Sequence, residues 1–245
     1  MSLTPTLNFR IDENYLIAHT LSSTNKKRFS SNKHKKDIVS FQNFAWSISK
    51  QKYLNLIKEY KPIEIKKPKD LSKKAQTFLA LLKLSKQYKK ILLQTQKYLL
   101  LCKSQWNKNL NHSSFLVREL TGIKMIRRFD VYISHPSLKN GMNLNGKILW
   151  GHNEDWTNYT TVYLWHEILH SYLSIPKNDR WNHAIIQLIA DNELRIKLNG
   201  GAYPPFYGHK ELFPLMRKIL PLWKKYLKSQ NKNILDFKHS YLQIL

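Results

Sequence analysis

Five consecutive residues, His166-Glu167-Ile168-Leu169-His170, combine two metal-binding side chains with one carboxylate. Side chains four positions apart lie one above the other on a helix, so His166 and His170 can bind the same cation. Glu167 lies about 100° around that helix from His166, where it can reach a water on the cation without binding the metal itself. The spacing therefore predicts a Zn2+ site in which Glu167 is the catalytic general base.

The residues around this motif indicate a buried helix. Residues 162–172 read VYLWHEILHSY, in which every position except His166, Glu167 and His170 is uncharged and neither Pro nor Gly occurs. Burying two His and one Glu without partners would cost several kcal/mol. A divalent cation would satisfy all three, which favours a metal site over three core residues.

Two strands and a second helix are expected to position this motif. Residues 129–135 and 147–151 are typical of strands, with the second strand antiparallel to the first. A second helix is expected from residue 178 or 179 to about Asn199, where Gly200 and Gly201 end it. The predicted fold class is α+β, mainly helical, with a small sheet beside the motif helix and the following helix.

This order of strands, His-Glu-x-x-His helix and second helix resembles the zincin metallopeptidases over about residues 126–200. The resemblance implies a zincin-like catalytic core, a peptide or protein substrate, and hydrolysis of peptide bonds by a metal-activated water. It also implies that Lys147–Gly151 is the edge strand along the substrate cleft. The alternative is a catalytically inactive zincin-like or basic helical protein that binds nucleic acid or another polyanion.

Catalytic zinc usually has three protein ligands, and the residues after His170 do not supply the third. On a helical wheel of residues 181–198, His183, Gln187 and Asp191 form one polar stripe. Asp191 is the preferred third ligand. It resembles the acid on the second helix of the gluzincins, although the first acid of their ExxxD pattern falls here on Gln187.

Two alternatives to Asp191 remain at this stage. Glu193 follows Asn192, as in the Asn-Glu pair of several gluzincins. His183 opens the second helix and resembles a ligand of the Spartan-like proteases, which act on DNA-protein crosslinks. Beyond this helix, Tyr207 and His209 are candidate oxyanion donors, with simple packing of the loop as the alternative.

The chain as a whole is strongly basic, with a net charge of +25 over 245 residues. This charge predicts attraction to nucleic acid or another polyanion, and a compositional bias toward Lys is the competing explanation. Residues 1–110 are expected to form a basic, mostly helical region, with residues 1–40 weakly ordered and a long helix from Asp70 to Cys102 or Trp106. Residues 111–245 would form the metallopeptidase domain.

The sequence also bears on the cellular compartment. It has no run of eighteen apolar residues and no apolar segment near its first residue, so neither a membrane span nor a secretory signal is expected. Cys102 is the single cysteine, which excludes an internal disulfide. The predicted location is the cytoplasm, with signal-less secretion as the alternative.

Overall fold

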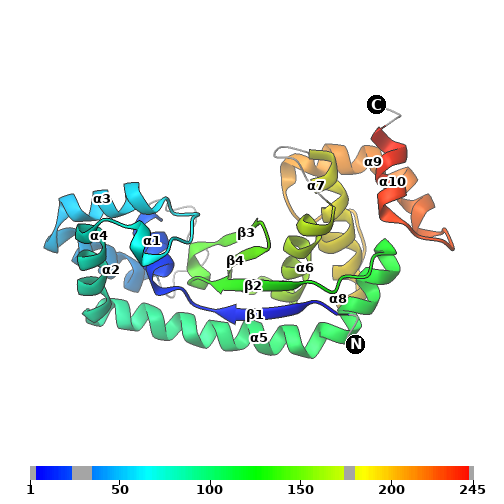
Figure 1. Ribbon diagram of the computed structural model, residues 1–245. Coiled ribbons are helices and arrows are strands. Elements are labelled where there is room, and N and C mark those ends of the chain that lie inside the picture. Colours follow the sequence, from blue (N-terminus) through cyan, green and yellow to red (C-terminus); the bar gives the residue numbers. More distant parts are fainter. Residues whose placement is uncertain (1–3, 24–34, 174–179, 243–245) are drawn as a thin grey trace.

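The structure, a computed structural model, describes residues 4–23, 35–173 and 180–242. It shows an α+β fold that is mainly helical, as expected, with one four-stranded sheet (Figure 1). The strands are β1 (Thr6–Arg10), β2 (Arg128–Ile133), β3 (Asn140–Leu144) and β4 (Lys147–Gly151). The α-helices are α1 (Glu13–Ser22), α2 (Lys35–Ile48), α3 (Lys50–Tyr60), α4 (Lys73–Leu84), α5 (Lys86–Thr121), α6 (Tyr159–Tyr172), α7 (Arg180–Gln187), α8 (Arg195–Asn199), α9 (Phe213–Leu227) and α10 (Ile234–Leu242). Short 3-10 turns are η2 (Pro68–Asp70), η3 (Pro136–Leu138) and η5 (Lys210–Leu212), and a π-helical segment, η4 (Leu188–Leu194), joins α7 to α8.

The sheet has the strand order β1-β2-β4-β3, in which only β3 is antiparallel to its neighbour. The expectation for Lys147–Gly151 was wrong in two respects, because β4 is an inner strand and runs parallel to β2. The cause is a two-residue turn at Asn145 and Gly146, whose φ angles of 51° and 87° suit a tight hairpin. This hairpin places β3 at the edge of the sheet.

The two faces of the sheet pack against two separate hydrophobic cores. Val131, Ile133, Ile148 and Trp150 face the core that contains α6 to α10. Tyr132 and Leu149, at the alternate positions of β2 and β4, face the core built from α1 to α4. Because successive strand residues point to opposite faces, these two short strands contribute to both cores.

The N-terminal segment is more ordered than predicted. Strand β1 pairs in parallel with β2, so Thr6 lies opposite Arg128. Helix α1 follows directly, and the Asp12 carboxylate accepts a hydrogen bond of 2.8 Å from the backbone N–H of Tyr15, which caps the helix. The expectation of weak order over residues 1–40 was therefore wrong for β1, α1 and the start of α2, while residues 24–34 lie outside the described part of the chain.

The long helix expected from Asp70 is divided into α4 and α5 at Ser85. The Ser85 hydroxyl accepts a hydrogen bond of 3.1 Å from the backbone N–H of Tyr88 and starts a new helix there. Helix α5 then continues to Thr121, where Gly122 ends it with a φ of 72°. The expected division between residues 110 and 111 thus falls inside one helix. Among the described residues, no helix is long and apolar enough to cross a membrane.

Candidate metal centre

Helix α6 carries the His-Glu-x-x-His motif and is fixed in place by α5. The backbone N–H of Thr161, in the first turn of α6, donates a hydrogen bond of 2.8 Å to the side-chain oxygen of Gln105. One turn later, the indole N–H of Trp165 donates to the Ser113 hydroxyl at 2.8 Å. These bonds satisfy polar groups that would otherwise be buried without partners, and they fix both the position and the rotation of α6.

The edge strand β3 is attached to the same helix. The Asn143 side-chain amide donates to the backbone carbonyl of Glu167 at 2.6 Å and to the Ser171 hydroxyl at 2.8 Å. At the other end of β3, a Cβ atom on Gly141 would lie 3.5 Å from Glu167 Oε1. The backbone of the edge strand therefore passes directly beside the carboxylate of the motif.

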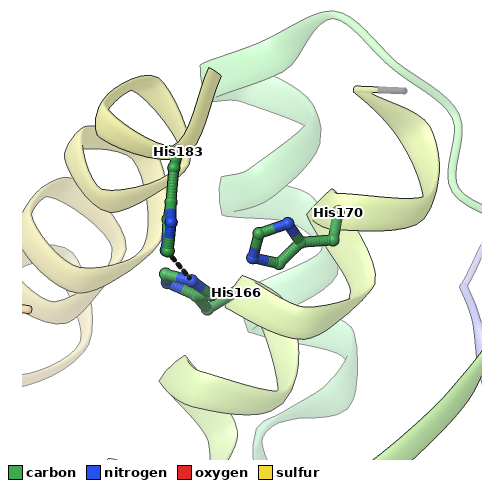
Figure 2. A group of neighbouring side chains, drawn as sticks. All are labelled: His166, His170 and His183. Carbon is green, nitrogen blue, oxygen red and sulfur yellow. Dashed lines mark hydrogen bonds between the residues drawn. The ribbon is translucent and has the colours of Figure 1, made fainter. Parts of the chain in front are cut away.

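Three imidazole rings meet between α6 and α7 (Figure 2). His166 and His170 extend from α6 and His183 from α7, with ring centroids separated by 5.0 to 5.1 Å in all three pairs. One nitrogen from each ring lies within 4.8 Å of the others. The tightest contact, 3.1 Å, joins Nε2 of His166 to Nε2 of His183.

This geometry and chemistry fit a divalent metal ion. Two nitrogens bound to one tetrahedral zinc at 2.0–2.1 Å would lie about 3.3 Å apart, close to the His166–His183 separation. Burial lowers the pKa of His166, His170 and His183 to about 3, so each ring keeps a free lone pair at neutral pH. Three neutral imidazoles also leave a fourth tetrahedral position for water or substrate.

Asp191, the preferred third ligand from the sequence, lies on the opposite side of His166 from this cluster. Its two carboxylate oxygens are 3.0 and 3.1 Å from Nδ1 of His166, and its side chain is completely buried. An acceptor at Nδ1 fixes the proton there and directs the Nε2 lone pair toward His170 and His183. Asp191 is therefore a hydrogen-bond partner of His166 that lies outside the histidine cluster, whereas His183, an alternative from the sequence, is the third member of that cluster.

Glu193, the other alternative, is turned away from the three histidines. The Tyr203 hydroxyl donates a hydrogen bond to its carboxylate and accepts one of 3.1 Å from the indole of Trp223. These contacts anchor the loop after α8 to α9. Glu193 thus has a structural partner and lies outside the candidate metal site.

The two candidate oxyanion donors are placed differently. The ring of His209 lies 4.8 Å from that of His183, centroid to centroid, and its side chain is half exposed. The ring of Tyr207 lies under the Arg195 guanidinium, 3.9 Å from its carbon, and edge-on to Trp156. Of the two, only His209 contacts the histidine cluster, whereas Tyr207 packs against Arg195 and Trp156.

Burial also controls the two acids of the site. The side chain of Glu167 is only 6% exposed. Its pKa is raised to about 8, mainly by this burial and further by the charge of Asp191. The pKa of Asp191 is likewise raised well above its usual range by burial. A nearby divalent cation would stabilise both carboxylates, because its positive charge would oppose the rise in their pKa values that burial causes.

The polar stripe predicted on the second helix faces α6, and the loop that carries Gly208 passes very close to two of its members. Gln187 is fully buried, and neither of its amide atoms has a hydrogen-bond partner among the described residues. A Cβ on Gly208 would lie 2.6 Å from Gln187 Nε2 and 2.5 Å from Asp191 Oδ2. Gly208 therefore lets the loop close over the polar stripe, a role that the sequence reasoning missed although a Gly between Tyr207 and His209 was visible.

No protein-family model, curated protein or solved structure matches this chain. Its function is therefore inferred from the side chains of the candidate metal centre and from the elements that position them.

Proposed function

We propose that the protein is a zinc-dependent metallopeptidase in which His166, His170 and His183 bind the metal and Glu167 is the general base. One observation carries this proposal: three neutral imidazoles converge from two helices, and the buried carboxylate of Glu167 follows one of them, His166, directly on the same helix. A purely structural metal site would need only the ligands. The adjacent Glu167 supplies the group that hydrolysis needs in addition.

The surrounding residues support distinct roles in such a reaction. Zinc, when bound, would acidify a coordinated water and polarise a carbonyl group. Glu167 would accept a proton and return it to the leaving amine. Asp191 would keep the proton of His166 on Nδ1, and His209 would donate a hydrogen bond to the negative charge that develops on the substrate oxygen.

The edge strand β3 supports a peptide as the substrate. Its partner β4 lies on one side only, so the backbone groups on its other side are available to an extended chain. Because Gly141 of β3 lies beside Glu167 Oε1, a peptide paired with this strand would pass close to the general base. Residues 140–144 thus take the role that the sequence assigned to Lys147–Gly151.

The test is hydrolysis of a mixed quenched-fluorescence peptide library by the zinc-loaded protein. Glu167→Gln should keep one zinc per chain and lose hydrolysis by at least about 100-fold, as expected for a general base. Glu193→Gln is the matched control, because it makes the same chemical change at an acid that bonds Tyr203, and it should keep full activity.

Two outcomes would contradict the proposal. Undiminished turnover by Glu167→Gln would reject the assigned base. Stoichiometric zinc binding without any hydrolysis across the library would instead indicate the inactive alternative, a zincin-like protein that binds metal and a partner but cuts no peptide.

A further inference from the structure

Most of helix α5 lies in a stretch of the chain that has no acidic residue. Between Asp70 and Glu119 the sequence contains ten Lys or Arg and neither Asp nor Glu. Helix α5 has 36 residues, which corresponds to a length of about 54 Å. In Figure 1 it runs along the lower side of the molecule, beneath β1 and β2, so one of its faces is on the outside.

The outer face of α5 alternates leucines with lysines. At about 100° per residue, seven exposed residues between positions 86 and 101 fall within an arc of about 120°. Lys90 pairs with Asp37, and the other six are Lys86, Lys89, Leu93, Lys97, Leu100 and Leu101. The opposite side of the helix carries buried residues such as Tyr88, Ile91, Tyr98 and Cys102. These six exposed residues are called the leucine-lysine face below.

The leucines of this face are unusually open to solvent. Leu93 is 52% exposed, Leu100 is 65% exposed and Leu101 is 46% exposed. The three lysines form no ion pair with any residue in the described ranges, unlike Lys90, which is 2.7 Å from Asp37. Apolar side chains separated by free ammonium groups are typical of a helix that lies in a membrane interface, where Leu enters the acyl boundary and Lys reaches the headgroups.

We propose that the leucine-lysine face docks this protein on an anionic lipid bilayer. Charge complementarity selects an acidic surface for the lysines, and the leucines select one with an apolar interior. A second copy of the chain fits poorly, because it would bring together two helices that each carry seven Lys or Arg and only one Glu. Nucleic acid would engage the lysines but give the three leucines nothing apolar to contact.

The straight outer side of α5 also suits a flat surface. Lys86 and Leu101 are separated by 15 residues, which is about 22 Å along the helix axis. Contact along this length would use all six side chains at once without any change in the fold. This inference is independent of the metal site, because none of these residues contacts the histidine cluster.

The experiment is co-sedimentation of the full-length protein with lipid vesicles. We expect binding to vesicles of 70% phosphatidylcholine and 30% phosphatidylserine, and far weaker binding to pure phosphatidylcholine. Each lysine near an anionic membrane surface contributes about five-fold to the binding affinity. The triple variant Lys86→Gln/Lys89→Gln/Lys97→Gln should therefore weaken binding on the order of 100-fold. The triple variant Leu93→Gln/Leu100→Gln/Leu101→Gln should weaken it by at least ten-fold.

A third variant, Leu54→Gln/Ile63→Gln/Leu222→Gln, is the matched control. It removes apolar side chains that are 47%, 49% and 39% exposed on other parts of the molecule, and it should bind vesicles as the parent protein does. Circular dichroism spectra of all variants should coincide, because every substituted side chain is exposed.

Three results would overturn the proposal. Equal binding to neutral and anionic vesicles would remove the role of the lysines. Loss of binding in the lysine variant but not in the leucine variant would indicate a purely electrostatic partner, such as nucleic acid. An equal loss in the control variant would show that the leucine-lysine face is not the site.

Discussion

Replacing Glu167 by Gln should stabilise the metal-free protein, and the gain should grow with pH. The Glu167 carboxyl is 6% exposed, and its pKa rises from 4.5 to about 8 on folding, mainly through burial. Between these two values the unfolded chain has lost this proton while the folded chain retains it. The free energy of unfolding of the native sequence therefore falls as pH rises through this window. Above about pH 8, Glu167 is ionised in both states and causes no further loss of stability.

The magnitude follows from the same pKa values. A rise from 4.5 to about 8 corresponds to a ceiling of about 5 kcal/mol, at about 1.36 kcal/mol per pH unit. The Gln side chain has nearly the same shape and no proton to lose. Glu167→Gln should therefore match the native sequence near pH 4.5 and exceed its free energy of unfolding by a few kcal/mol at pH 8.5.

The assay is urea denaturation of chelator-treated protein at several pH values from 4.5 to 8.5. Glu193→Gln is again the control, and its stability should follow the native profile because its partner is the Tyr203 hydroxyl. Saturating zinc should flatten the native profile, since the cation would stabilise the Glu167 carboxylate. Parallel profiles for the native and Glu167→Gln proteins without metal would refute the burial of this acid.

Three further predictions concern the candidate metal centre. Asp191→Asn should lower zinc affinity about 10- to 100-fold in a chelator competition, because Asp191 orients His166. Glu193→Gln is the control and should leave the zinc affinity unchanged. A greater loss of affinity in Glu193→Gln than in Asp191→Asn would contradict the orienting role of Asp191. Gly208→Ala should lower the midpoint of thermal unfolding by several degrees, because the added Cβ would clash with Asp191 and the φ of this residue is 103°. Gly146→Ala is the control: its φ is 87° but the space around it is open, so its midpoint should fall less. Equal midpoints for the two variants would contradict the close approach of Gly208 to Asp191. Zinc should remain bound at pH 5.5 in equilibrium dialysis. Burial lowers the pKa of all three histidines to about 3, so protons compete with zinc for the ring nitrogens only well below pH 6.5. Release of half of the zinc at pH 6.5 would indicate that the histidines are exposed to solvent.

The pairing of His166 and His170 could be predicted from the sequence because it depends only on helical spacing. Which residue joins this pair could not be predicted, although His183, Gln187 and Asp191 were expected to share one face of the second helix. A helical wheel shows which residues share a face, but not how that face is set against α6. The structure places His183 at Nε2 of His166 and Asp191 at Nδ1, on opposite sides of one ring.

The sheet was predicted only in part, for a related reason. Residues 129–135 and 147–151 have the β-branched and aromatic side chains of strands, so both were found. Strand β1 pairs with residues more than a hundred positions away. Strand β3, with the sequence NGMNL, has only two apolar residues and no β-branched or aromatic one. The local signal that was available, the Asn145-Gly146 turn, would have indicated a hairpin and hence an edge strand at residues 140–144.

The central claim, that His166, His170 and His183 form one zinc site, is tested most directly by metal analysis of two histidine variants. His183→Ala removes a proposed ligand, and His209→Ala removes a neighbouring imidazole that is half exposed and lies 4.8 Å from it between ring centroids. After zinc loading and gel filtration, the native protein and His209→Ala should each retain about one zinc per chain, and His183→Ala should retain almost none. Full zinc content in His183→Ala, with folding intact by circular dichroism, would contradict the three-histidine site.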